Sequence, residues 1–499
     1  MATDQASADA YDQLLDRIQR ISYLSDAGGV LGWDQQVTMP EGGAPARGKQ
    51  LSAISGLTHE LLTDDEVAEW IAACEAQDLD AEQAAVVREI KRRHEREAAV
   101  PESLVEEHTE KSSEANQIWQ DAKADSDWDS FAGILDEMKE LRVERAQHID
   151  PEADPYAVMY EGSMPTLPLE TVEEIFADLK DGLIPLIDDI REHGEPLPRP
   201  FEGMTFDPDE QEALNEAAAD FLGYDWDRGR LDTSAHPFTS GTQFDARITT
   251  RYQEDDPLDG LMATIHEFGH ATYQLGLPQD HYGTPLGSAR GEVHESQSRF
   301  WENHVGRTRP FWEEFLPTFK EHLSGVDDLS VDEVYQAANR IYPENTIRVE
   351  ADELTYHMHI ILRHDIEQEY VSGDLTVEEI PERWNELMDQ YLDVTPETTA
   401  DGALQDIHWT GRFGGFPSYT VGSVLAAQLT ATMEEDVDIE GCIRDQDFDR
   451  LWEWMTENLH SHGQRYEADE LIEHITGDPL SADAFLEYAE TKFTDLYGL

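Results

Sequence analysis

Apolar residues recur at intervals of three and four along most of the chain, and this spacing restricts the 499 residues to a mainly helical fold. The spacing is clearest over residues 11–21 and 175–187. Alternation of apolar and polar residues, the pattern of a strand, is scarce and is best developed over residues 243–252. We therefore expect a mainly α fold with a small antiparallel sheet. Because the sequence shows no linker and no internal repeat, we expect residues 1–499 to form a single domain.

The charge balance is extreme. The chain carries 108 Asp and Glu against 35 Lys and Arg, a formal net charge of -73. Such self-repulsion opposes the compact state in dilute buffer, but at 1 M salt the screening length falls to about 3 Å. We interpret the charge as adaptation to a salt-rich cytoplasm, as in a halophile; an acidic cation-binding protein and a nucleic-acid mimic are the alternatives. Direct binding to DNA or RNA is excluded because no basic face is available to neutralise phosphates.

The cysteine count and the apolar runs bear on the compartment. Cys74 and Cys442 are the only cysteines, so neither a disulfide framework nor a cysteine-based zinc site is expected. The first 20 residues lack the basic and then apolar pattern of a signal peptide. No apolar run approaches the roughly 20 residues of a membrane span. These features predict a soluble, cytoplasmic protein that does not associate with a membrane.

A His-Glu-x-x-His motif lies within residues 256–275, which have the pattern of a helix. Asp256 can cap this helix, and Gly276 can end it. His266 and His270 lie one turn apart, so both imidazoles can bind one metal ion. Glu267 follows the first histidine and can reach a water molecule on that metal. The motif predicts a catalytic zinc site.

A catalytic zinc needs a third protein ligand and one open position. The Gly-rich loop 276–291 reverses the chain, and a second predicted helix, residues 292–303, returns toward the histidines. This helix offers both His294 and Glu295. Neighbouring residues on a helix diverge by about 100°, so at most one of the two is expected to bind the metal.

Several separate segments, taken together, resemble the carboxypeptidase Taq family, the M32 metallocarboxypeptidases. The resemblance extends over nearly the whole chain, and the segments occur in the order that the family has. They are Trp33-Asp34 to Met39-Pro40 with Arg47; His236-Pro-Phe; Asp245, Arg247 and Thr249; His266 to His270; His294 to Gln297; Ile347, Arg348, Ala351 and Asp352; and Gly402, Gln405, Asp406, His408 and Trp409.

The resemblance implies a helical, saddle-like metallopeptidase fold with a deep groove. It favours Glu295 over His294 as the third metal ligand. It also implies Zn²⁺ as the cofactor, with Co²⁺ able to substitute, and removal of single C-terminal residues from peptides with broad specificity. A homodimer is the assembly that the family implies.

The mechanism that we expect uses metal-activated water, with Glu267 as general base and then general acid. An exopeptidase must also bind the terminal carboxylate. Arg348 is the candidate, because a guanidinium can donate two hydrogen bonds to a carboxylate; the alternative for Arg348 is a structural pair with Asp352.

Three further residues are candidates for binding the oxyanion or the substrate backbone, or alternatively for a packing role: His236, His408 and Tyr419.

Two other functions stay open at this point. One is a zinc oligopeptidase or endopeptidase on a similar helical fold. The other is a non-catalytic acidic binding protein whose zinc is structural, which an intact Glu267 beside a three-ligand site argues against.

Overall fold

The computed structural model describes residues 2–499, with side chains from residue 10 onward. The chain divides into two compact units. Unit 1 comprises residues 1–98, 199–338 and 429–478, and unit 2 comprises residues 99–198, 339–428 and 479–499. Each unit is thus built from three separate stretches of sequence. Both are mainly helical, so the expected fold class is confirmed.

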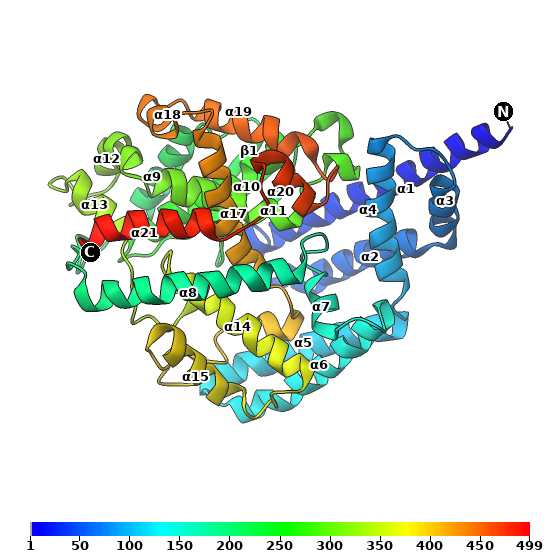
Figure 1. The fold of residues 1–499 in the computed structure, drawn as a ribbon, viewed down its shortest axis with the longest axis horizontal. Coiled ribbons are helices and arrows are strands. Elements are labelled where there is room, and N and C mark those ends of the chain that lie inside the picture. Colours follow the sequence, from blue (N-terminus) through cyan, green and yellow to red (C-terminus); the bar gives the residue numbers. More distant parts are fainter. Residues whose placement is uncertain (1) are drawn as a thin grey trace. The chain divides into compact units, whose positions relative to one another are not determined.

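Unit 1 holds the N-terminal helices, the sheet and the helices around it (Figure 1). Its α-helices are α1 (Ala2–Val37), α2 (Ala44–Thr63), α3 (Asp65–Glu75), α4 (Ala81–Ala98), α9 (Pro208–Leu222), α10 (Pro257–Gly276), α11 (Gly291–Arg299), α12 (Arg309–His322), α13 (Val331–Ala338), α18 (Ile439–Asp445), α19 (Phe448–Asn458) and α20 (Ala468–Thr476). A π-helical segment, η4 (Phe300–Gly306), continues α11 without a break.

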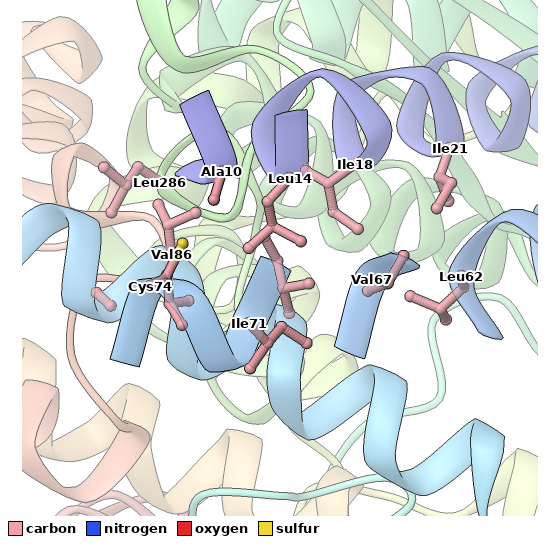
Figure 2. Close-up of a cluster of buried hydrophobic side chains, with 13 residues drawn as sticks. Ala10, Leu14, Ile18, Ile21, Leu62, Val67, Ile71, Cys74, Val86 and Leu286 are labelled. Atoms are coloured by element: carbon pink, nitrogen blue, oxygen red, sulfur yellow. The ribbon is translucent and has the colours of Figure 1, made fainter. Parts of the chain in front are cut away.

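The apolar spacing over residues 11–21 forms one side of a packed core (Figure 2). Leu14, Ile18 and Ile21 of α1 are buried against residues of α3 and α4, among them Ile71. Leu286, from the loop between α10 and α11, belongs to the same cluster. The N-terminal helices therefore pack against the segment that leads into α11.

The sheet has three strands, β1 (Gly229–Thr233), β2 (Thr239–Thr242) and β3 (Asp245–Thr250), in the order β1-β3-β2. A two-residue turn joins β2 to β3 as an antiparallel hairpin, whereas β1 pairs with β3 in parallel. The sheet is therefore mixed, and the expectation of an antiparallel one was wrong for this pair. Leu231 is the one large apolar residue of β1, so this strand has no repeated apolar alternation by which it could be predicted from the sequence.

The strand predicted over residues 243–252 is shorter than expected. Ala246 and Ile248 are fully buried against α10, as the alternation implies. Phe244 instead lies in the β2–β3 turn and is 47% exposed. The hairpin turn overrides the alternation at this residue.

Unit 2 is built from helices, most of them long (Figure 1). They are α5 (Glu102–Asp125), α6 (Trp128–Ile149), α7 (Pro155–Tyr160), α8 (Leu169–His193), α14 (Thr355–Ser372), α15 (Ile380–Leu392), α16 (His408–Gly411) and α21 (Asp483–Tyr497). One further helix, α17 (Pro417–Glu434), has residues in both units. The apolar spacing of residues 175–187 forms the buried face of α8, which packs beside α21.

Within residues 2–499, none of the helices is both long enough and apolar enough to cross a membrane.

Candidate metal centre

The helix α10 carries the two histidines of the His-Glu-x-x-His motif. Its start is fixed as expected, because the Asp256 side chain accepts a hydrogen bond from the backbone N–H of Leu258 at 2.9 Å. His266 and His270 lie one turn apart, and each directs Nε2 toward Glu295 of α11. The Nε2 atoms lie 3.7 Å and 3.5 Å, respectively, from the two carboxylate oxygens. The predicted triad of His266, His270 and Glu295 is thus brought together.

Close contact between α10 and α11 makes this convergence possible. Gly269 lies between the two histidines in sequence and faces the backbone of α11. A Cβ atom at this position would stand 2.5 Å from both the carbonyl oxygen of Gln297 and the Cα of Ser298. Only a residue without a side chain fits there, so Gly269 allows Glu295 to approach the histidines.

The second ring nitrogen of each histidine also has a partner. His266 Nδ1 lies 2.9 Å from Oε2 of Glu302, and His270 Nδ1 lies 2.8 Å from Nδ1 of His294. Such contacts fix the orientation of an imidazole and leave its Nε2 available to a metal. His294 therefore contacts the Nδ1 side of His270, away from the Nε2 atom that faces Glu295.

Glu302 is positioned by the π-helical turn that follows α11. Its carboxylate accepts hydrogen bonds from Arg299 at 3.0 Å and from Arg307 at 2.8 Å. Arg299 also donates to Glu295 at 3.1 Å. One guanidinium therefore links Glu302, the carboxylate at Nδ1 of His266, to Glu295, which faces both histidines. π-Helical turns occur frequently at functional sites. This turn places Glu302 and Glu295 against the same histidine.

Burial and charge oppose each other at these groups. Burial acts to raise the pKa of Glu295, but His266, His270 and Arg299 outweigh it and hold that pKa well below its ordinary value. Burial acts to lower the pKa of His266, but the carboxylates of Glu295 and Glu302 outweigh it and raise that pKa. For His294, burial dominates and lowers the pKa to about 3, so this imidazole is neutral at pH 7.

The donor set fits a divalent metal ion. The two imidazole nitrogens and the carboxylate oxygen all lie within 4.8 Å of one another. A tetrahedral zinc with bonds of about 2.0–2.1 Å separates its ligand atoms by roughly 3.4 Å, close to the distances between the histidines and Glu295. Two histidines and one carboxylate also leave a fourth position for water or substrate.

Glu267 follows His266 on α10 and is 6% exposed. Its Oε2 accepts a hydrogen bond of 2.6 Å from the hydroxyl of Thr239, the first residue of β2. The carboxylate of the motif is therefore held from the side of the sheet.

Arg348, His408 and Tyr419 lie in unit 2. Arg348 donates from Nε and Nη2 to Asp406 at 3.0 and 2.7 Å and from Nη1 to the Tyr356 hydroxyl at 3.3 Å. Arg363 also donates to Asp406, at 2.5 Å. Two guanidinium groups thus share one carboxylate. Burial acts to raise the pKa of Asp406, but Arg363 and Arg348 outweigh it and hold that pKa far below its ordinary value.

The expected alternative for Arg348, a pair with Asp352, does not form. Asp352 instead accepts hydrogen bonds from the backbone N–H groups of Leu354 and Thr355 at the start of α14. The sequence spacing of four suggested a helical pair, but Arg348 lies in a short 3-10 turn, so that geometry does not apply.

His408 and Tyr419 lie close to Arg348. His408 Nε2 is 3.4 Å from the Tyr419 hydroxyl, and the Arg348 guanidinium lies 5.8 Å from the Tyr419 ring centroid. Burial is the largest influence on His408 and lowers its pKa to about 4, so this imidazole is neutral at pH 7. His236 belongs to unit 1, where it is exposed on the loop that leads into β2.

Sequence reasoning missed several residues of the site. Glu302 is seven residues after Glu295, which on a helix puts both on one face, and this spacing could have identified it. Arg299, four residues after Glu295, gives a similar signal. Thr239 has no such signal, because its contact with Glu267 depends on how the sheet packs on α10.

The chain is similar to known proteins over nearly its whole length. Residues 13–493 match the family described as carboxypeptidase Taq (M32) metallopeptidase. Thermostable carboxypeptidase 1 of Thermus thermophilus is 38% identical over 98% of this chain and 99% of its own length. The structure of Pyrococcus furiosus carboxypeptidase has a TM-score of 0.94 at 34% identity, covering 97% of this chain and 99% of that one.

A more distant likeness concerns the fold alone. A putative oligoendopeptidase F shares it with a TM-score of 0.56 at 13% identity, covering 99% of this chain and 96% of that one. The match over the full length at more than 30% identity shows family membership as well as fold. The chain belongs to the carboxypeptidase Taq (M32) metallopeptidase family and is a metallocarboxypeptidase.

Proposed function

We propose that the protein is a zinc-dependent carboxypeptidase that releases single C-terminal residues from peptides with broad specificity. Family membership implies peptide substrates and a divalent metal. The observation that carries the proposal is the convergence of His266, His270 and Glu295 within 4.8 Å. We propose these three residues as the metal ligands.

Zinc is the proposed metal because two imidazoles and one carboxylate form a typical catalytic zinc set. Co²⁺ accepts the same nitrogen and oxygen donors and is expected to substitute. When bound, the metal polarises a peptide carbonyl and lowers the pKa of water toward about 7.

Glu267 is the proposed general base and acid. Its carboxylate lies on the same helix as the two histidines and is largely buried, which favours proton transfer over exchange with bulk water. Glu267 takes a proton from the attacking water and gives it to the nitrogen of the departing amine. The peptide C–N bond breaks as that nitrogen becomes a neutral amine.

Arg348 is the proposed partner of the substrate's terminal carboxylate. Arg348 and Arg363 together carry two positive charges against the single negative charge of Asp406. This excess favours an anion, in a chain that is otherwise strongly acidic. Asp406 holds the Nε and Nη2 side of Arg348, so we propose that the Nη1 side binds the terminal carboxylate.

His408, Tyr419 and His236 are proposed as further groups that bind the substrate. The contact between His408 and Tyr419 supports joint action by those two, whereas exposure of its loop is the only support for His236. Neutral His408 can donate one hydrogen bond to a carbonyl oxygen without adding charge.

We also propose that the enzyme is cytoplasmic, adapted to high salt and a homodimer. Within each chain, residues 1–499 are proposed to function as a single domain. The net charge of -73 supports salt adaptation. Both cysteines are free thiols, as is usual in a reducing compartment. The resemblance to the family supports the dimer.

Two peptides of identical sequence, one with a free C-terminus and one with an amide, test the proposal. The zinc-loaded enzyme in molar salt should trim the free peptide one residue at a time and leave the amide intact. Equal cleavage of both would reject the exopeptidase reaction and favour an endopeptidase. Arg348→Lys should weaken trimming of the free peptide, since lysine cannot make the same planar contacts.

A Glu267→Gln variant separates metal binding from catalysis. It should retain zinc and lose activity by at least about a hundredfold, the usual range for a general base. Wild-type rates in a zinc-loaded Glu267→Gln enzyme would exclude Glu267 as the base.

A further inference from the structure

Thr239 is the residue of the sheet that contacts the proposed base. Its hydroxyl lies 2.6 Å from Oε2 of Glu267 and 3.0 Å from the backbone carbonyl oxygen of the same residue. Both distances are within hydrogen-bond range. The hydroxyl has a single hydrogen, and the ionised carboxylate, at the shorter distance, is the stronger of the two acceptors.

The position of Thr239 is fixed by the strand that contains it. In the sheet register, Thr239 lies opposite Ile248 of β3, which is fully buried. Phe238, the preceding residue, donates its N–H to the Thr249 hydroxyl at 2.9 Å, and its carbonyl oxygen accepts from the Thr249 N–H at 3.0 Å. The ring of Phe238 also packs 5.4 Å from that of Trp33.

These contacts make the hydroxyl a fixed donor rather than a mobile loop group. A carboxylate that accepts a bond at Oε2 cannot rotate freely about its terminal torsion, so Oε1 is left to take the proton. Positioning of this kind matters, since small errors in the placement of a catalytic group reduce rates strongly.

We infer that Thr239 is a positioning residue for Glu267, and this inference rests on the proposed role of Glu267 as the base. The hydroxyl donates its hydrogen to Oε2 while Glu267 is a carboxylate. When Oε1 has accepted a proton from the attacking water, that proton passes to the amine nitrogen, and the bond to Oε2 keeps the side chain in place throughout.

The simpler alternative is a structural tie between β2 and α10. The hydrogen bond to the Glu267 carbonyl oxygen would serve that purpose alone. The two roles differ in outcome: a tie affects folding and metal binding, whereas positioning affects kcat while substrate and metal binding stay unchanged.

The test compares Thr239→Ser with Thr239→Ala, since both lack the methyl group and only serine retains the hydroxyl. Thr239→Val keeps the shape of the side chain and covers the case in which alanine fails to fold. Thr242→Val is the matched control, because strand alternation puts residue 242 on the opposite face of β2. For each, kcat, KM, bound zinc per chain and the unfolding midpoint are measured in molar salt.

Positioning predicts that alanine and valine lower kcat by about tenfold or more, since a hydrogen bond to a charged group is lost. KM and bound zinc should stay within about twofold of wild type, and serine should restore most of kcat. The control variant should keep the kcat, KM and bound zinc of wild type. Its unfolding midpoint should fall slightly, because the Thr242 hydroxyl accepts a hydrogen bond from the N–H of Phe244 in the turn.

Two results would overturn the inference. Alanine and serine variants with equal kcat would remove the role of the hydroxyl, and loss of zinc or of folding in step with activity would leave only a structural tie. Glu267→Gln is measured in parallel. If Glu267→Gln is inactive but the Thr239 variants are normal, only this inference fails; if Glu267→Gln is fully active, the proposed base fails as well.

Discussion

Gly269 of α10 faces Ser298 of α11 so closely that a Cβ on the glycine would stand 2.5 Å from the Cα of the serine. The two helices supply all three proposed metal ligands, two from α10 and one from α11. The separation between these backbones therefore sets the distance from Glu295 to the histidines, and a single methyl group is enough to change it.

We predict that Gly269→Ala lowers the free energy of unfolding by about 1–3 kcal/mol, as overpacking does, and weakens zinc binding. The backbone atoms in the way cannot rotate aside as a side chain would. Denaturant unfolding and zinc competition with a chromophoric chelator measure the two effects. Gly56→Ala in α2, where the added Cβ would meet no atom within 4 Å beyond the adjoining backbone of its own helix, should instead raise stability by about 0.5–1 kcal/mol. Normal zinc affinity in Gly269→Ala would show that helix spacing does not control the site.

The carboxylate beneath His266 should affect metal affinity without binding the metal. Glu302→Gln keeps the shape but removes the negative charge that accepts from His266, Arg299 and Arg307. We expect zinc to bind about 10- to 100-fold more weakly, the usual effect of removing such a partner. Glu333→Gln is the control, since among the described residues that carboxylate accepts hydrogen bonds only from Ser330 in its own turn. Unchanged zinc affinity in Glu302→Gln would contradict this role.

Glu367 in α14 should make stability depend on pH. Burial raises its pKa to about 7, although Gly414 and Trp409 donate hydrogen bonds that act the other way. The folded state thus holds this proton more tightly than the unfolded chain. The contribution is fully present below about pH 4.5 and is lost as the pH rises through about 7. The loss corresponds to about 3 kcal/mol.

Other groups titrate over the same range, so the difference between wild type and Glu367→Gln isolates this effect. Unfolding free energies at several pH values in molar salt should fall more steeply for wild type than for the variant between pH 4.5 and 7. Parallel curves would show that Glu367 keeps an ordinary pKa.

We predict that folding requires molar salt. With a net charge of -73, repulsion is screened over about 3 Å at 1 M salt but extends over about 30 Å at 0.01 M. Circular dichroism after dialysis into low-salt buffer should show loss of helix, and return of salt should restore it. A full native spectrum at low salt would contradict the proposed salt adaptation.

The metal helix could be predicted from sequence because its signals are local. The cap at Asp256, the spacing of His266 and His270 and the end at Gly276 all depend on residues within one helix, and each appears as expected. The third metal ligand had to come from a separate helix, and the spacing of residues left both Glu295 and His294 as candidates. In the structure Glu295 faces Nε2 of both histidines, whereas His294 contacts Nδ1 of His270.

Other features depend on contacts between distant segments, which periodicity does not contain. The parallel pairing of β1 with β3 and the hydrogen bond from Thr239 to Glu267 follow from how the chain crosses the sheet. Arg348 illustrates the same limit, because its partner is Asp406, 58 residues away, rather than nearby Asp352. The π-helical turn after α11 likewise departs from the regular helix that the spacing predicts.

Mass spectrometry of a peptide ladder tests the central claim most directly. A peptide with a free C-terminus is incubated in molar salt with the zinc-loaded enzyme, with the chelator-treated enzyme, and with the treated enzyme after zinc is returned. We predict stepwise loss of C-terminal residues in the first and third samples and an intact peptide in the second. Equal trimming by the chelated, zinc-free protein, or internal cleavage in place of a ladder, would contradict the account.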